Sequence, residues 1–142
     1  MYENILVPSD GSKGASGAVE HALGIAAEYG ATVHGLYVIE PVYAVETRTE
    51  KLVDAMRAEG KRAVAEVAEM ADDRGLESVT AVRTGPPHTE LLDYAAEHDI
   101  DLIVMGTHGR TGLNRFLLGS VTEKVVRLSD VPVLTVRAGD EA

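Results

Sequence analysis

One stretch of the sequence, residues 106–127, combines glycines with positive charge in an otherwise acidic chain. Its glycines, which allow a backbone to approach a ligand closely, include Gly106, Gly109, Gly112 and Gly119. Between residues 107 and 127 a single acid, Glu123, stands among four cations: Arg110, Arg115, Lys124 and Arg127. Ser120 follows the last glycine at the start of a predicted helix, whose free N–H groups attract anions. These residue types in this order indicate a phosphate-binding site.

A purely structural explanation of the stretch stays open, in which the glycines only punctuate a long loop and Ser120 only caps the helix. The spacing fits neither a P-loop, G-x-x-x-x-G-K-[ST] after the first strand, nor the dinucleotide motif G-x-G-x-x-G. The sequence also shows no evident magnesium-binding acid pair or arginine finger, which argues against fast phosphoryl transfer. We therefore predict binding rather than catalysis, and no catalytic residue.

Composition excludes several classes of function. The chain has 142 residues with 23 Asp and Glu against 13 Lys and Arg, a formal net charge of -10, which argues against a nucleic-acid surface. It has no cysteine, and its five histidines lack metal-ligand spacing, so no metal site is predicted. His34 interrupts an apolar run and is expected to be a hydrogen-bonded or surface residue rather than a ligand or catalyst. Because no run approaches about 18 apolar residues, we expect a cytoplasmic protein that does not enter membranes.

The elements that position this stretch follow from the hydrophobic pattern. Short runs rich in Val, Ile and Leu predict strands at 4–7, 32–39, 78–84, 101–106 and 131–136. Helical periodicity predicts helices at 15–29, 48–74, 89–98 and 120–128. Strict alternation of the two implies right-handed crossovers and a parallel sheet with helices on both faces. We predict one doubly wound α/β domain over residues 1–142.

Burial patterns predict the order of the strands. The runs at 4–7 and 101–106 are apolar without interruption and belong in the centre of the sheet. The run at 78–84 alternates, and Pro132 near the start of 131–136 suits an edge strand. The order 3-2-1-4-5 satisfies these constraints and puts the topological switch point between the first and fourth strands. Ligands bind outside the carboxyl ends of strands at such a point, where "PSDGSKG" meets the glycine-rich stretch.

Three segments resemble the universal stress protein family over essentially the whole chain: "ILVPSDGS", "DLIVMGTHGRTGLNRFLLGSVTEKVV" and "VPVLTVR". Gly106, Gly109, Gly119 and Ser120 form G-x2-G-x9-G-[ST], which is similar to the signature of the ATP-binding subclass. The resemblance implies an adenine nucleotide alpha hydrolase-like fold and a homodimer. It also implies ATP as the ligand, with AMP or ADP as further candidates and Mg²⁺ accompanying the nucleotide.

The resemblance also implies roles for individual residues. Asp10 accepts hydrogen bonds from the ribose hydroxyls, although an Asx turn is an alternative or additional role. The residues bordering the adenine are Pro8, Ser9, Val38, Met105 and Gly106. Those along the ribose and phosphates are Thr107, His108, Gly109 and Arg110. An anion cradle of two backbone donors and two hydroxyls is formed by Gly119, Ser120, Val121 and Thr122.

Three classes of function stay open on this evidence. The first is an ATP-dependent switch or sensor in stress responses, in which nucleotide orders the 107–119 loop and changes what the dimer presents to a protein partner. The second is a slow ATPase or a self-phosphorylating protein with Ser120 or Thr122 as acceptor. The third is a nucleotide-independent interaction module. Separately from these classes, we predict that the edge strand 131–136 pairs with its copy in a homodimer, because only Pro132 discourages pairing there.

Overall fold

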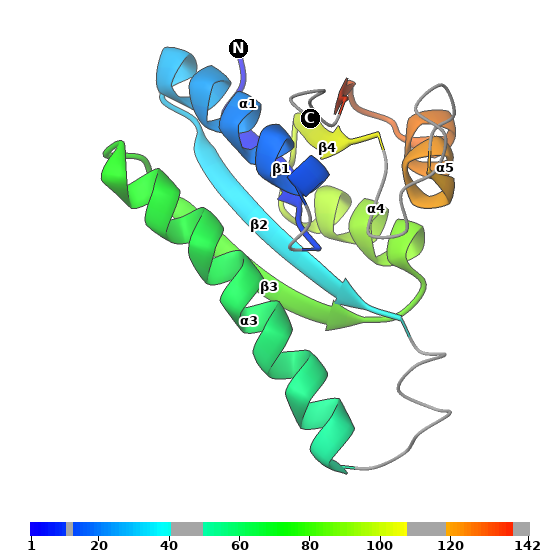
Figure 1. The fold of residues 1–142 in the computed structure, drawn as a ribbon. Helices are drawn as coiled ribbons and strands as arrows, with labels where there is room; N and C mark the ends of the chain where they lie inside the picture. Colours follow the sequence, from blue (N-terminus) through cyan, green and yellow to red (C-terminus); the bar gives the residue numbers. More distant parts are fainter. Residues whose placement is uncertain (11–12, 41–49, 108–118, 138–142) are drawn as a thin grey trace.

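The computed structural model describes residues 1–10, 13–40, 50–107 and 119–137. Strands and helices alternate along the chain (Figure 1): β1 (Asn4–Pro8), α1 (Lys13–Tyr29), β2 (Thr32–Ile39), α3 (Glu50–Asp73), β3 (Ser78–Thr84), α4 (Pro87–Glu97), β4 (Leu102–Gly106), α5 (Ser120–Leu128) and β5 (Val133–Val136). The strands form one parallel sheet in the order β3-β2-β1-β4-β5. The predicted doubly wound fold and strand order are confirmed.

Helices cover both faces of the sheet because the central strands are apolar on both sides. Ile5 and Val7 of β1 pack with α1 and α3, whereas Leu6 between them packs with α4 and α5. β4 divides in the same way, with Val104 on the first face and Ile103 on the second. All of these side chains are fully buried. The uninterrupted apolar runs therefore mark strands with two covered faces, as predicted.

Element boundaries differ from the prediction by a few residues. α4 begins at Pro87, two residues before the predicted start at residue 89. A proline is tolerated at the first helical position, because an N–H there would have no intrahelical partner. β5 begins at Val133 rather than at residue 131. The hydroxyl of Ser129 bonds both the N–H and the carbonyl of Val131, and this local turn delays the strand until after Pro132. None of the described helices is long and apolar enough to cross a membrane.

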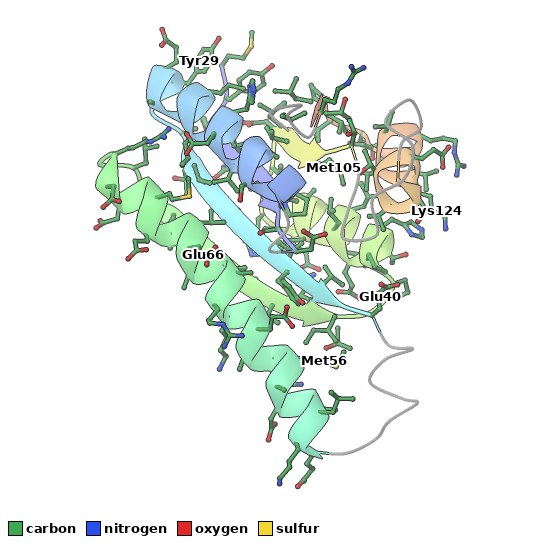
Figure 2. All side chains as sticks on the ribbon, viewed as in Figure 1. Tyr29, Glu40, Met56, Glu66, Met105 and Lys124 are labelled. Carbon is green, nitrogen blue, oxygen red and sulfur yellow. The ribbon has the colours of Figure 1, made fainter. Side chains whose placement is uncertain are left out.

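The long helix α3 lies close to β2 at one point. A Cβ atom on Gly60 would come within 2.7 Å of the ring of Tyr37, so the absence of a side chain allows this approach. Met56 and Met70 lie on the same helix and pack, partly buried, against apolar clusters. Met56 is labelled on α3 in Figure 2. Both methionines therefore have a packing role.

Candidate functional site

The carboxyl ends of β1 and β4 leave the sheet side by side at its switch point. Leu6 of β1 pairs with Ile103 of β4, so the residues that follow these strands emerge at the same edge. The N–H of Ser9 donates to the carbonyl of Leu36 at 2.8 Å, which extends the bonding to β2 beyond the end of β1. Asp10 comes next and is half-buried. The geometry thus brings Asp10 to the edge where β4 ends.

The amino end of α5 is attached to the end of β4 by two hydrogen bonds. The N–H of Gly119 donates to the carbonyl of Thr107 at 2.6 Å, and the hydroxyl of Thr122 donates to the carbonyl of Gly106 at 2.8 Å. The N–H of Thr107 in turn donates to the carbonyl of Val136 in β5 at 3.0 Å. A helix start, a strand end and the edge strand therefore meet at residues 106–107.

The residue that caps α5 is not Ser120, as the purely structural explanation of the glycine-rich stretch requires. The N-cap is Gly119, with φ -63 and ψ 158 and no side-chain capping bond, and Ser120 is the first helical residue. The idea that Ser120 is only an N-cap is therefore wrong, because its backbone already lies inside the helix. Ser120 is exposed, whereas Thr122 is buried. Of the two hydroxyls considered as phosphate acceptors, the one on Ser120 is thus the more accessible.

An ion pair modifies the charge near this helix start. Arg127 donates from Nε to a carboxylate oxygen of Glu123 at 3.0 Å, one helical turn apart on the exposed side of α5. The hydrogen bond from Arg127, followed by the positive charges of Arg127 and Lys124, lowers the pKa of Glu123. Glu123 therefore stays ionised, and Arg127 offsets its charge next to a helix end that favours anions.

The structure gathers the described members of the predicted site at one edge of the sheet. Val38, Met105 and Val121 contribute to one apolar cluster, on the face covered by α4 and α5. Met105 is 4% exposed, so it supports the floor of this region from within the core. The other predicted residues described at this edge are Pro8, Ser9, Asp10, Gly106, Thr107, Gly119, Ser120 and Thr122. Three predicted residues lie outside the described residues: His108, Gly109 and Arg110.

A second polar cluster lies under α4, away from this edge. His34 is 4% exposed; its Nδ1 lies 2.7 Å from the hydroxyl of Tyr94, and its Nε2 lies 3.0 Å from Oδ1 of Asn4. Burial first, and then the nearby charge of His98, lower the pKa of His34. Of the two roles expected for His34, hydrogen-bonded or at the surface, the structure shows the first. The sequence offered no signal for Tyr94 as its partner, because 60 residues separate the two.

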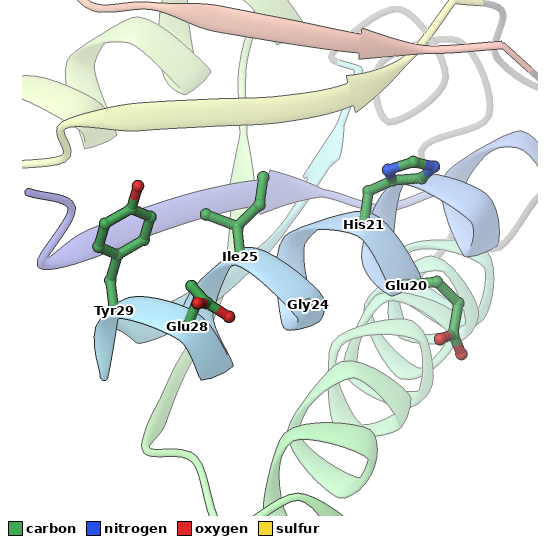
Figure 3. Close-up of a pocket in the computed structure, with 6 residues that line it drawn as sticks. All are labelled: Glu20, His21, Gly24, Ile25, Glu28 and Tyr29. Carbon is green, nitrogen blue, oxygen red and sulfur yellow. The ribbon is translucent and has the colours of Figure 1, made fainter.

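A shallow pocket lies on the outer side of α1, apart from both polar regions. It has a volume of about 490 Å³ and is lined by one helix (Figure 3): Glu20, His21, Gly24, Ile25, Glu28 and Tyr29. None of these residues belongs to the predicted nucleotide site. Within ranges 1–10, 13–40, 50–107 and 119–137, no three His, Asp or Glu residues are grouped so as to hold a metal ion.

Comparison with known proteins decides the family. Residues 1–137 match the model of Usp, the Universal stress protein family. The chain belongs to this family. Its sheet order and flanking helices are those of the adenine nucleotide alpha hydrolase-like fold shared by universal stress proteins.

Relatives of this universal stress protein span archaea and bacteria. It is 38% identical over 141 residues to Universal stress protein MJ0531 of Methanocaldococcus jannaschii, which covers 96% of this chain and 83% of the relative. It is 32% identical over 148 residues to Universal stress protein YxiE of Bacillus subtilis, covering 96% of this chain and all of the relative. The likeness therefore extends over nearly the whole chain.

Solved structures agree with the sequence comparison. The structure of MJ0577 from Methanocaldococcus jannaschii superimposes with a TM-score of 0.88 at 33% identity, covering 99% of each chain. A universal stress protein solved in complex with cAMP has a TM-score of 0.71 at 28% identity, covering 97% of this chain and 99% of the other. The second protein holds an adenine nucleotide on the same fold.

Proposed function

We propose that this universal stress protein binds an adenine nucleotide where β1 and β4 end, and acts as a nucleotide-dependent switch or sensor in stress responses. The observation that carries the proposal is the attachment of the α5 amino end to residues 106–107, at the edge where Asp10 leaves β1. A helix amino end favours anions, and an aspartate accepts hydrogen bonds from hydroxyls. The relative in complex with cAMP supports the class of ligand. ATP is the ligand that we expect, with AMP or ADP as further candidates and Mg²⁺ accompanying it.

In this proposal each part of the site recognises one part of the nucleotide. Asp10 accepts hydrogen bonds from the ribose, and the N–H groups at the start of α5 bind the phosphates. The adenine lies against the strand ends, which contribute Pro8, Ser9, Val38, Met105 and Gly106. Further phosphate and ribose contacts come from Thr107, His108, Gly109 and Arg110, and the anion cradle from Gly119, Ser120, Val121 and Thr122. Thr122 contributes to the cradle through its N–H, because its hydroxyl donates to the carbonyl of Gly106.

Calorimetric titration of the purified protein with ATP, AMP and adenosine tests this proposal. Asp10→Ala removes the acceptor for the ribose hydroxyls. It should therefore lower the affinities for ATP and AMP by the same factor, about tenfold or more for a charged hydrogen bond. Gly119→Val adds a β-branched side chain at the buried N-cap and should abolish phosphate-dependent binding. Asp10→Asn, which keeps an acceptor without the charge, is the matched variant. If both folded variants bind ATP as the wild type does, these residues do not form the nucleotide site. A folded wild type that binds none of the three ligands would favour the interaction module instead.

We further propose that the switch works as a homodimer formed through β5. This strand pairs with β4 on one side and lies at the end of the sheet order. Leu134 is 37% exposed there, and pairing with a second copy under two-fold symmetry would cover it. Light scattering at micromolar concentration should give the mass of a dimer. A monomer under these conditions contradicts this assembly without affecting nucleotide binding.

A further inference from the structure

We infer that Thr122 is a positioning residue for the phosphates: its buried hydroxyl holds the first turn of α5 in the place from which the helix binds them. This inference rests on the proposed nucleotide-binding function. In this role the Thr122 hydroxyl donates its hydrogen bond to the carbonyl of Gly106 and not to the ligand.

The burial and the bond of Thr122 support this role. Thr122 is 4% exposed, and a buried hydroxyl requires a hydrogen-bond partner. Its partner is the main-chain carbonyl of Gly106, the last residue of β4, at 2.8 Å. Because the hydroxyl has one proton and donates it to this carbonyl, it has no second proton to donate to a phosphate oxygen. The buried position also makes Thr122 a poor acceptor for a phosphoryl group.

Two attachments fix the direction of α5 as well as its position. Gly119 is the N-cap and Thr122 is the third helical residue, so both lie on one side of the first turn. Gly119 donates to the carbonyl of Thr107, and Thr122 donates to the neighbouring carbonyl of Gly106. With a single attachment, the helix start would be free to tilt about that point. Two attachments, to consecutive carbonyls, restrict that tilt.

The two attachments determine the direction of the first N–H groups of α5. The N–H of Glu123 donates to the carbonyl of Gly119 at 2.9 Å, which is the first bond of the helical ladder. The N–H groups of residues 120–122 precede it and have no intrahelical acceptor. Their direction is that of the helix axis, so loss of the Thr122 bond should affect phosphates and leave the nucleoside contacts unchanged.

The test compares Thr122→Val, which removes the hydroxyl and nearly keeps the shape, with Thr122→Ser, which keeps the hydroxyl. Affinities for ATP and adenosine are measured by calorimetry at one salt concentration, after circular dichroism has shown that each variant is folded. We expect Thr122→Val to lower the affinity for ATP by about 3- to 10-fold, which is the effect of one hydrogen bond. Its affinity for adenosine should stay within about twofold of the wild-type value. Thr122→Ser should keep the wild-type ratio of the two affinities.

The ratio of ATP to adenosine affinity separates positioning from general stability, because a loss of stability alone does not change it among folded variants. An unchanged ratio in Thr122→Val overturns the inference, as does an equal loss in Thr122→Ser. If Thr122→Val does not fold, Thr122→Ala also lacks the hydroxyl and replaces it in the same comparison. A wild-type protein that binds no ATP contradicts the proposed function itself, so the two failures are distinguishable.

Discussion

Apart from tyrosines, Thr122 and His34 are the buried polar side chains of the described residues; each is 4% exposed, but their surroundings differ. Thr122 bonds a main-chain carbonyl at the carboxyl edge of the sheet. His34 bonds two side chains, those of Tyr94 and Asn4, beneath α4. A bond to the main chain relates two backbone segments directly. Bonds between side chains instead join rings within the core and determine which nitrogen carries a proton.

The hydrogen bonds of His34 define its protonation state. Oδ1 of Asn4 accepts a hydrogen bond, so Nε2 of His34 is the nitrogen that donates. Because burial, and then the charge of His98, lower the pKa of His34, the ring carries one proton at neutral pH, so Nδ1 accepts from the hydroxyl of Tyr94, whose own pKa is raised by burial. His34 is thus neutral, with both nitrogens bonded. A second proton would require the Tyr94 hydroxyl to turn and accept, and it would place a buried positive charge near His98.

Among the predictions that test this comparison, Tyr94→Ala should cause the largest loss of stability. Tyr94 is 1% exposed, and truncation of a buried aromatic ring costs about 3–5 kcal/mol in the free energy of unfolding. Urea denaturation measures this loss, and the folded variant should bind ATP within about twofold of wild type. Tyr94→Phe is the matched control, because it removes only the hydroxyl and should cost about 1–3 kcal/mol. A selective loss of ATP affinity in folded Tyr94→Ala would show that the two polar regions are coupled.

A change in pH should have a smaller effect on the free energy of unfolding, through His34. The folded protein holds His34 neutral with a lowered pKa, while the unfolded chain has the ordinary value of 6.5. Below that value the unfolded state binds more protons, so stability falls as pH decreases from 6.5 toward the folded pKa. This residue contributes a slope of at most about 1.4 kcal/mol per pH unit, measured from urea midpoints. His34→Gln should reduce the slope, whereas Thr122→Ser should leave it unchanged. Equal slopes in wild type and His34→Gln would contradict the assignment.

The smallest effect on stability is expected from Ser120→Ala, in the same first turn of α5 as Thr122. Ser120 is exposed and follows an N-cap that makes no side-chain bond, so the change in unfolding free energy should be within about 0.5 kcal/mol. The same variant should weaken ATP in calorimetry if its hydroxyl contacts the phosphates. A stability loss of about 1 kcal/mol or more would instead indicate a capping role that the structure does not contain.

Much of the fold was predictable because burial on two faces leaves a pattern in the sequence. The apolar runs that became β1 and β4 predicted central strands, and Pro132 predicted an edge. The start of β5 was placed two residues early, since the turn made by the Ser129 hydroxyl is a local hydrogen bond with no periodic signal. In the candidate site, the glycine spacing and the family resemblance proposed candidate residues, but carried no information on the bonds among them.

The sequence by itself determined the alternation of strands and helices, the order of the sheet and the edge at which a ligand is expected. These properties follow from periodicity and from the chirality of crossovers, which every compact arrangement of this chain must satisfy. Only the tertiary structure decided that Thr122 donates to Gly106 and that His34 pairs with Tyr94. Hydrogen-bond partners depend on how far each helix is rotated and shifted over the sheet. That placement results from the packing of all core side chains together, so no local pattern specifies it.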